Sequence, residues 1–273
     1  MGDRTALSVR TAAIPWRLAA YAATISLALG ALLAYALTGP RASSVPTGAH
    51  APSVSRTLLS SLPLSALAPV STTLGAADQS YRVLPFAGGG FNAHNPAQRL
   101  DVSFQTARVL LSSGATRVGL GLRGLGLGRS LGAIGQARVS SQADRVLYAR
   151  SGLSEWYANG PLGLEQGFTV LRAPAGPASS PLTLSLAVSG DARAALGAGG
   201  KSIVFTSHGG PSLRYGDMVA SDASGRTLDS WLELQGQRVL LRVDAQGARY
   251  PLRIDPLVQQ QKLAGSGGSG EGL

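Results

Sequence analysis

From Tyr81 onward, short apolar runs alternate with turn-forming residues, and this pattern restricts the fold of the chain more than any other feature. The 273 residues include 36 glycines and 15 prolines, which interrupt helices and favour turns. We find no helical periodicity longer than a couple of turns beyond Ser80, and 191–196 is the best short helical candidate. The pattern therefore predicts many short strands.

Several runs have the composition and length of strands. Val118, Leu120 and Leu122 alternate with small or charged residues, as in a half-buried strand. Other strand candidates are 108–111, 145–149, 155–158, 167–171, 182–188 and 202–206. Near the end, 231–234, 238–243 and 250–254 are separated by Gly-containing turns at 235–236 and 244–247, of two and four residues, which predict antiparallel hairpins. We expect an antiparallel β-sandwich over residues 81–262.

An uncharged segment near the N-terminus predicts export. Residues 18–37 are almost wholly apolar, and as a helix they would span a hydrocarbon core of about 30 Å. Three arginines precede the segment and only Arg41 follows it closely, which places the N-terminus in the cytoplasm and the rest of the chain outside. The segment either remains as a single-pass membrane anchor or is a signal peptide cleaved near Ala36, after a small-x-small pattern.

These features divide the chain into four parts. Residues 1–37 form a cytoplasmic stub with the transmembrane or signal segment, and 38–80 form a linker rich in Ser, Pro and Ala. The expected β-sandwich domain occupies 81–262. The Gly/Ser-rich tail occupies 263–273.

Charge and cysteine content exclude several classes of function. The chain has no cysteine, which excludes disulfides, thiolate metal sites and a cysteine nucleophile. The net charge is +10, but the arginines are spread along the chain rather than clustered with aromatic residues. This distribution does not indicate nucleic-acid binding. It fits a solvated cationic surface or an attraction to anionic envelope polymers.

Glycine and histidine patterns give no cofactor or metal site. The segment 119–124 matches G-x-G-x-x-G, but the glycine-rich run 125–132 that follows cannot begin a stable helix, so we expect a strand with one bare face. His50, His94 and His208 lie far apart in sequence and lack the spacing of metal ligands. A Ser-His-Asp triad, which assembles from distant positions, stays open, although no G-x-S-x-G motif is present.

The segment 155–168 holds the best candidate catalytic residues. Glu155 and Glu165 could act as the paired acids of a carbohydrate-active or other hydrolytic enzyme, with Trp156 and Phe168 lining the site. We favour the alternative in which 159–161 forms a turn and the aromatic side chains fill the core. Two carboxyl groups about 5–10 Å apart in an open cleft would support the enzyme, and acids on opposite faces would oppose it.

Four segments together resemble a known type of domain: EWYANGPLGLEQGF (155–168), LTLSLAVSG (182–190), LRYGDMVASDASGR (213–226) and YPLRIDPLVQQQKL (250–263). They are similar to the N-terminal β-sandwich domain of bacterial surface proteins that carry FG-GAP (integrin-α-like) or SBBP-type β-propeller repeats. In those proteins a stretch like RIDP ends the domain and a Gly/Ser-rich stretch opens the first repeat. The resemblance covers 81–273 and implies an exported protein with an adhesive or scaffolding role.

The repeats themselves are missing from this sequence, which suggests a fragment or a truncated gene. We therefore expect a non-catalytic, exported structural or interaction module of the cell surface, without a cofactor. We expect its partners to be the membrane, through 18–37, and envelope polymers or another protein. The alternatives are an envelope-associated carbohydrate-active or hydrolytic enzyme, and a truncated remnant without function.

Overall fold

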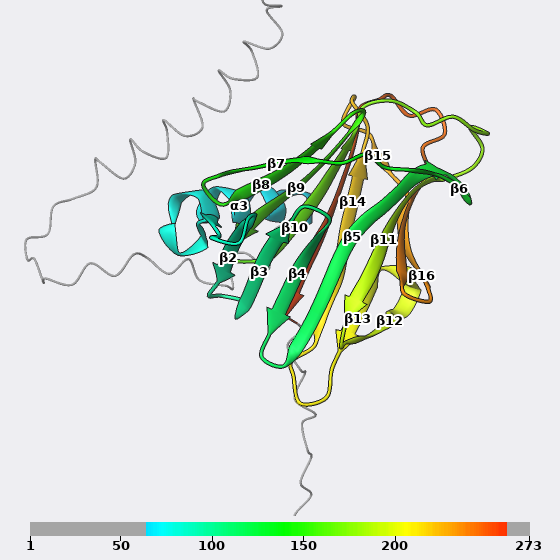
Figure 1. Ribbon diagram of the computed structural model, residues 1–273. Coiled ribbons are helices and arrows are strands. Elements are labelled where there is room, and N and C mark those ends of the chain that lie inside the picture. The colour runs from blue at the N-terminus through cyan, green and yellow to red at the C-terminus, as the bar shows by residue number, and fades with distance from the viewer. Residues whose placement is uncertain (1–63, 261–273) are drawn as a thin grey trace, which may run out of the picture. The chain divides into compact units, whose positions relative to one another are not determined.

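The computed structural model describes residues 64–260, with side chains described from residue 69 onward. Figure 1 shows two β-sheets facing each other and one helix beside them. Sheet A has nine strands: β1 (Leu84–Pro85), β2 (Phe91–Asn95), β3 (Leu100–Gln105), β4 (Arg108–Ser113), β5 (Thr116–Leu127), β6 (Ser130–Ala133), β11 (Leu182–Gly190), β16 (Ser230–Gln235) and β17 (Arg238–Val243).

Sheet B also has nine strands: β7 (Arg138–Gln142), β8 (Arg145–Arg150), β9 (Leu153–Gly160), β10 (Gly163–Val170), β12 (Arg193–Leu196), β13 (Ser202–Thr206), β14 (Leu213–Ser221), β15 (Thr227–Leu228) and β18 (Leu252–Gln260). The helical elements are α3 (Leu64–Ala77), η1 (Gln79–Tyr81) and η2 (Ala198–Gly200).

The core lies between the two sheets. Along the longer strands of both sheets, the side chains that point inward are buried. Phe104 of sheet A contacts Tyr157 of sheet B edge to face, with ring centroids 5.4 Å apart. Every strand pair within residues 64–260 is antiparallel, so the prediction of a mainly β, antiparallel architecture is confirmed, and the arrangement is that of a β-sandwich.

The chain changes sheets more often than the sequence suggests. β16 and β17 form the expected hairpin across Gln235–Arg238. The second expected hairpin, between 238–243 and 250–254, is wrong, because β17 belongs to sheet A and β18 to sheet B.

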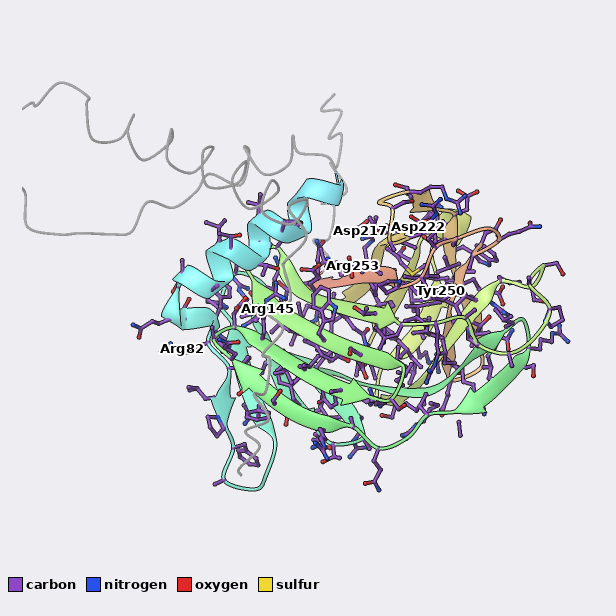
Figure 2. The ribbon with its side chains drawn as sticks, turned by 90° about the horizontal axis from the view of Figure 1, so that it is seen from above. Arg82, Arg145, Asp217, Asp222, Tyr250 and Arg253 are labelled. Carbon is purple, nitrogen blue, oxygen red and sulfur yellow. The ribbon has the colours of Figure 1, made fainter. Side chains whose placement is uncertain are left out.

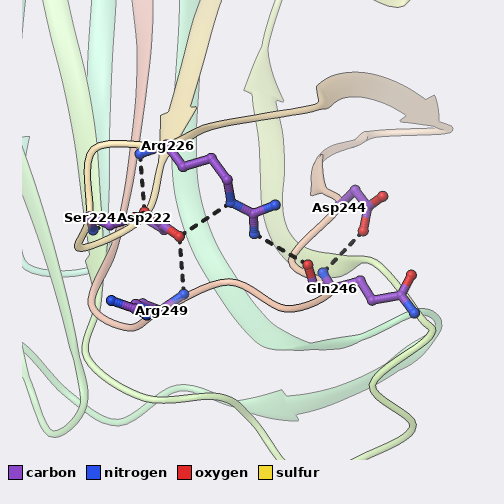
Figure 3. A network of polar contacts seen from close by, with 6 residues as sticks. All are labelled: Asp222, Ser224, Arg226, Asp244, Gln246 and Arg249. Carbon is purple, nitrogen blue, oxygen red and sulfur yellow. Dashed lines mark hydrogen bonds and ion pairs between the residues drawn. The ribbon is translucent and has the colours of Figure 1, made fainter.

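A buried carboxylate, Asp222, holds the crossing between β17 and β18 in place (Figure 3). It accepts hydrogen bonds from the backbone N–H groups of Ser224 and Arg226 in its own loop and of Arg249 in the crossing segment. The Ser224 hydroxyl also donates to Asp222 Oδ1, at 2.6 Å. This hydrogen bond first, and then those from the backbone, stabilise the ionised form and lower the pKa of Asp222 well below its usual value.

The helical candidate 191–196 is also wrong. Residues 193–196 form the edge strand β12, which pairs with β13 in register Ala194↔Phe205. Six residues are too few to repay helix nucleation, so pairing with the neighbouring strand decides the conformation.

Helix α3 falls inside the segment 38–80 that the sequence assigns to a linker. It packs against β9 on the outer side of sheet B (Figure 2). Its closest approach is between backbones: a Cβ on Gly75 would lie 2.1 Å from the carbonyl oxygen of Asn159, and a Cβ on Gly160 would lie 2.4 Å from that of Ser71. Two glycines therefore allow the helix to rest directly on the strand.

Because this contact leaves no room for a side chain, Gly75→Leu should lift α3 from sheet B. We expect a loss of about 1–3 kcal/mol in unfolding free energy, as for other overpacked contacts, together with faster proteolysis within 64–77. Limited proteolysis with mass spectrometry and denaturant unfolding measure both effects. Ala76→Leu, at an exposed neighbouring position of the same helix, is the control. Equal behaviour of the two variants would contradict the docking described here.

The predicted transmembrane or signal segment at 18–37, the cleavage position near Ala36 and the tail 263–273 lie outside the described residues. Within 64–260, no helix is long and apolar enough to cross a membrane.

Candidate functional site

Glu155 lies inside the core between the sheets. Its carboxylate forms an ion pair with Arg150 at 3.1 Å and accepts hydrogen bonds from the Tyr157 hydroxyl at 2.8 Å and the Gln166 amide at 2.9 Å. The side chains of Glu155 and Arg150 are only 5% and 7% exposed. Tyr215 extends the network by donating to Gln166 Oε1. Burial, reinforced by the nearby Glu155 charge, raises the pKa of both tyrosines well above the usual value.

Glu165 lies on the opposite face of the same sheet. It pairs with Ala158 of β9, three residues from Glu155, and side chains alternate faces along a strand. Its Oε2 accepts a hydrogen bond from Thr72 of α3, and burial raises its pKa. Because Glu155 points into the core and Glu165 points away from it, the two acids cannot flank one substrate bond, and the geometry does not support the paired-acid site.

The two aromatic residues proposed beside these acids also separate. Phe168 is buried in the core, as expected. For Trp156 the expected core position is wrong: it is on the outer face, where its ring lies over Gly167, whose absent side chain leaves room for it. Arg145 and Arg253, both labelled in Figure 2, lie over the same ring at 5.4 and 6.0 Å from its centroid.

Asp255 is the acid on this face that sequence reasoning missed. The register places it opposite Gly167 and diagonally next to Glu165. Its Oδ1 is buried without a hydrogen-bond partner among the described residues. Burial raises the pKa of Asp255 to about 7. The Arg253 charge lowers this pKa in part, and the Glu165 charge adds a smaller increase. The sequence did hold a signal for this position. Side chains alternate faces along β18, and because Ile254 and Val258 point inward, Asp255 points to the outer face.

A hollow lies on the outer face of sheet A, and we call it the sheet A trough. It has a volume of about 760 Å³, within the range of about 300–1,000 Å³ typical of ligand sites. Its floor is one row of neighbouring residues across six strands: Leu84, Asn92, Ser103, Leu110, Gly119 and Ser189. None of these side chains is charged, and Gly119 adds no side chain to the floor.

Charged residues border this floor. Arg82, before β1 and labelled in Figure 2, and Arg117 of β5 line the trough, and Arg108 of β4 lies on its other side. All three arginines are exposed, and none forms an ion pair with a carboxylate of the described residues. Arg108 donates one hydrogen bond to Gln105. Asp101 is the single carboxylate in the lining, so the border is cationic.

His94 and Asp101 form a pair in this border, with His94 Nδ1 2.7 Å from Asp101 Oδ1. Such a pair is two-thirds of a Ser-His-Asp triad, and several serines line the same trough. The His94 and Asp101 side chains are 57% and 70% exposed, whereas the aspartate of a triad is normally buried. The described hydrogen bonds of His94 include none to a serine hydroxyl. His94 lies in β2, opposite Asp101 of β3.

The described residues contain no group of three or more His, Asp or Glu side chains suited to hold a metal ion. The chain matches no family model and no curated protein.

Proposed function

We propose that this chain is an exported, non-catalytic module of the cell surface that binds other components of the envelope. Residues 18–37 would hold it in the membrane, or would be removed by cleavage near Ala36. In both cases residues 81–262 would lie outside the cytoplasm. The charge pattern around 18–37 and the resemblance to domains that precede FG-GAP or SBBP-type repeats support this proposal.

The sheet A trough is the observation that carries the binding role. An open hollow with an uncharged floor of apolar and hydroxyl- or amide-bearing side chains and a cationic border is suited to hold a ligand by contact, hydrogen bonds and charge. The position of Glu155 supports a non-catalytic role, because Arg150, Tyr157 and Gln166 already bind its carboxylate inside the core.

A valine at Gly119 tests the role of the trough. Its Cβ would meet only the side-chain ends of Ser189 at 2.3 Å and Leu110 at 3.1 Å, which can move, so the strand should persist while the floor rises. We expect Gly119→Val to reduce retention of the full chain on detergent-extracted cell-envelope material several-fold. Gly132→Val, on exposed strand β6 outside the trough, is the matched control. Unchanged retention of Gly119→Val would contradict a binding role for this face.

The His94–Asp101 pair favours a second candidate, an envelope-associated hydrolase that uses this histidine as a base. Turnover of ester or glycoside substrates by the full chain that is abolished in His94→Ala would support the hydrolase over the binding module.

A further inference from the structure

The chemistry of the sheet A trough selects among possible ligands. We infer that the trough binds a linear glycan that carries anionic groups, which lies across the strands from β1 to β11. This inference rests on the proposed function and adds a ligand class to it.

The shape of the trough fits an extended chain. Its floor row crosses six strands, and neighbouring strands lie about 4.8 Å apart, so the row is about 24 Å long. Gly119 adds no side chain to the middle of the floor, and the side chains of Ser189 and Leu110 lie over the position that its Cβ would take. A flat, narrow strip of this length suits a polymer better than a compact small molecule.

Hydrogen-bonding groups of the trough come from side chains rather than from the backbone. The strands of the floor from β3 to β11 are each paired on both sides, so their N–H and C=O groups are engaged. A peptide that binds by strand addition needs free backbone groups at a sheet edge, and this surface is a sheet face. Ser103, Ser112, Ser189 and Asn92 instead offer hydroxyl and amide groups, which match the hydroxyls of sugars.

The charge of the border indicates an anionic ligand. Arg82, Arg108 and Arg117 surround the floor, and the one carboxylate, Asp101, is already paired with His94. Guanidinium groups form paired hydrogen bonds with carboxylate and phosphate or sulfate oxygens. Because the arginines stand on both sides of an uncharged floor, the ligand would contact the floor through its sugar rings and the border through its acidic groups.

The test compares two triple variants of the full chain that have the same net charge. Arg82→Gln/Arg108→Gln/Arg117→Gln removes the cationic border. Arg138→Gln/Arg172→Gln/Arg193→Gln removes three exposed arginines outside the trough. The probes are an oligogalacturonate, a sulfated oligosaccharide, a neutral glucose oligomer of equal length and poly-glutamate. Affinity is measured by fluorescence anisotropy at low and high salt.

We expect one or both of the anionic oligosaccharides to bind, and the one that binds better identifies the acidic group. The border variant should weaken this binding about tenfold, and the control variant less than threefold. Added salt should weaken binding of the wild type and bring it close to that of the border variant.

Equal loss in both triple variants, or no binding of either anionic oligosaccharide, would overturn the inference. Tighter binding of poly-glutamate than of both anionic glycans would also overturn it, in favour of an acidic peptide. Failure of this inference can be distinguished from failure of the proposed function. If retention on envelope material still depended on Gly119, the trough would remain an interaction surface for another ligand.

Discussion

Glu155→Ala should reduce the free energy of unfolding by about 3–5 kcal/mol, the range measured when one partner of a buried ion pair is removed. The substitution leaves the Arg150 guanidinium, 7% exposed, without its carboxylate. It also removes the acceptor for the Tyr157 hydroxyl and one acceptor of the Gln166 amide in the middle of the core. Chemical denaturation monitored by tryptophan fluorescence measures the effect.

Two further variants show whether charge causes this loss. Asp101→Ala, at a side chain that is 70% exposed, should change stability by less than about 0.5 kcal/mol. The double variant Arg150→Met/Glu155→Leu should be more stable than Glu155→Ala, because it removes both charges and keeps the volume filled. A double variant that is less stable than Glu155→Ala would show that the polar network, rather than the unpaired charge, dominates.

Asp255→Asn should stabilise the protein at pH 8 and leave its stability nearly unchanged at pH 4. The pKa of Asp255 is about 7 in the folded protein, above its ordinary value of 3.8, so the folded state binds this proton more tightly than the unfolded state. The protonated form is therefore favoured by folding. Its contribution is complete below about pH 4 and is lost as the pH rises through about 7.

The size of this effect follows from the shift. Each pKa unit corresponds to about 1.4 kcal/mol, and partial exposure and relaxation reduce the total, so we expect a gain of about 2–4 kcal/mol at pH 8. Asparagine stays neutral at both pH values. Urea unfolding of both proteins from pH 4 to pH 8 measures the difference, and Asp229→Asn, at an exposed position, is the control. A gain that is the same at pH 4 and pH 8 would contradict the assignment of the titration to Asp255.

The sequence was sufficient to predict strands and their antiparallel pairing, because both depend on local patterns. Val118, Leu120 and Leu122 show the alternation that buries one face of β5, and Gln235–Gly236 marks the β16–β17 hairpin. The bare face of 119–124 was also expected, and Gly119 now forms part of the trough floor.

Features that depend on which sheet a strand joins could not be predicted locally. The turn 244–247 after β17 has the length of a hairpin connection, but the chain runs on to residue 251 before β18 begins. A hydrogen bond from the Arg249 N–H to Asp222, distant in sequence, accompanies its passage to the other sheet. Asn159 was read as a turn residue, whereas its amide is fully buried, bonds Asn95 of sheet A and donates to the backbone of His94. The opposite orientation of Glu155 and Glu165 follows from the hairpin register, which places their strand positions an odd number of residues apart.

The trough could not be predicted from the sequence for the same reason. Its floor combines residues from β1 to β11, which are more than a hundred positions apart, and only the order of strands in sheet A brings them into one row. No single floor residue has an unusual neighbourhood in the sequence.

Export of the β-domain is the central claim of this account, and the location of the C-terminus tests it most directly. The full chain with a C-terminal tag is expressed, cells are fractionated, protease is added outside the cytoplasmic membrane, and the mature N-terminus is sequenced. We predict that the external protease removes the tag. An intact N-terminus in the membrane fraction would indicate an anchor, and a new N-terminus after about residue 36 would indicate a cleaved signal peptide. A tag that stays protected in the cytoplasmic fraction would contradict the account.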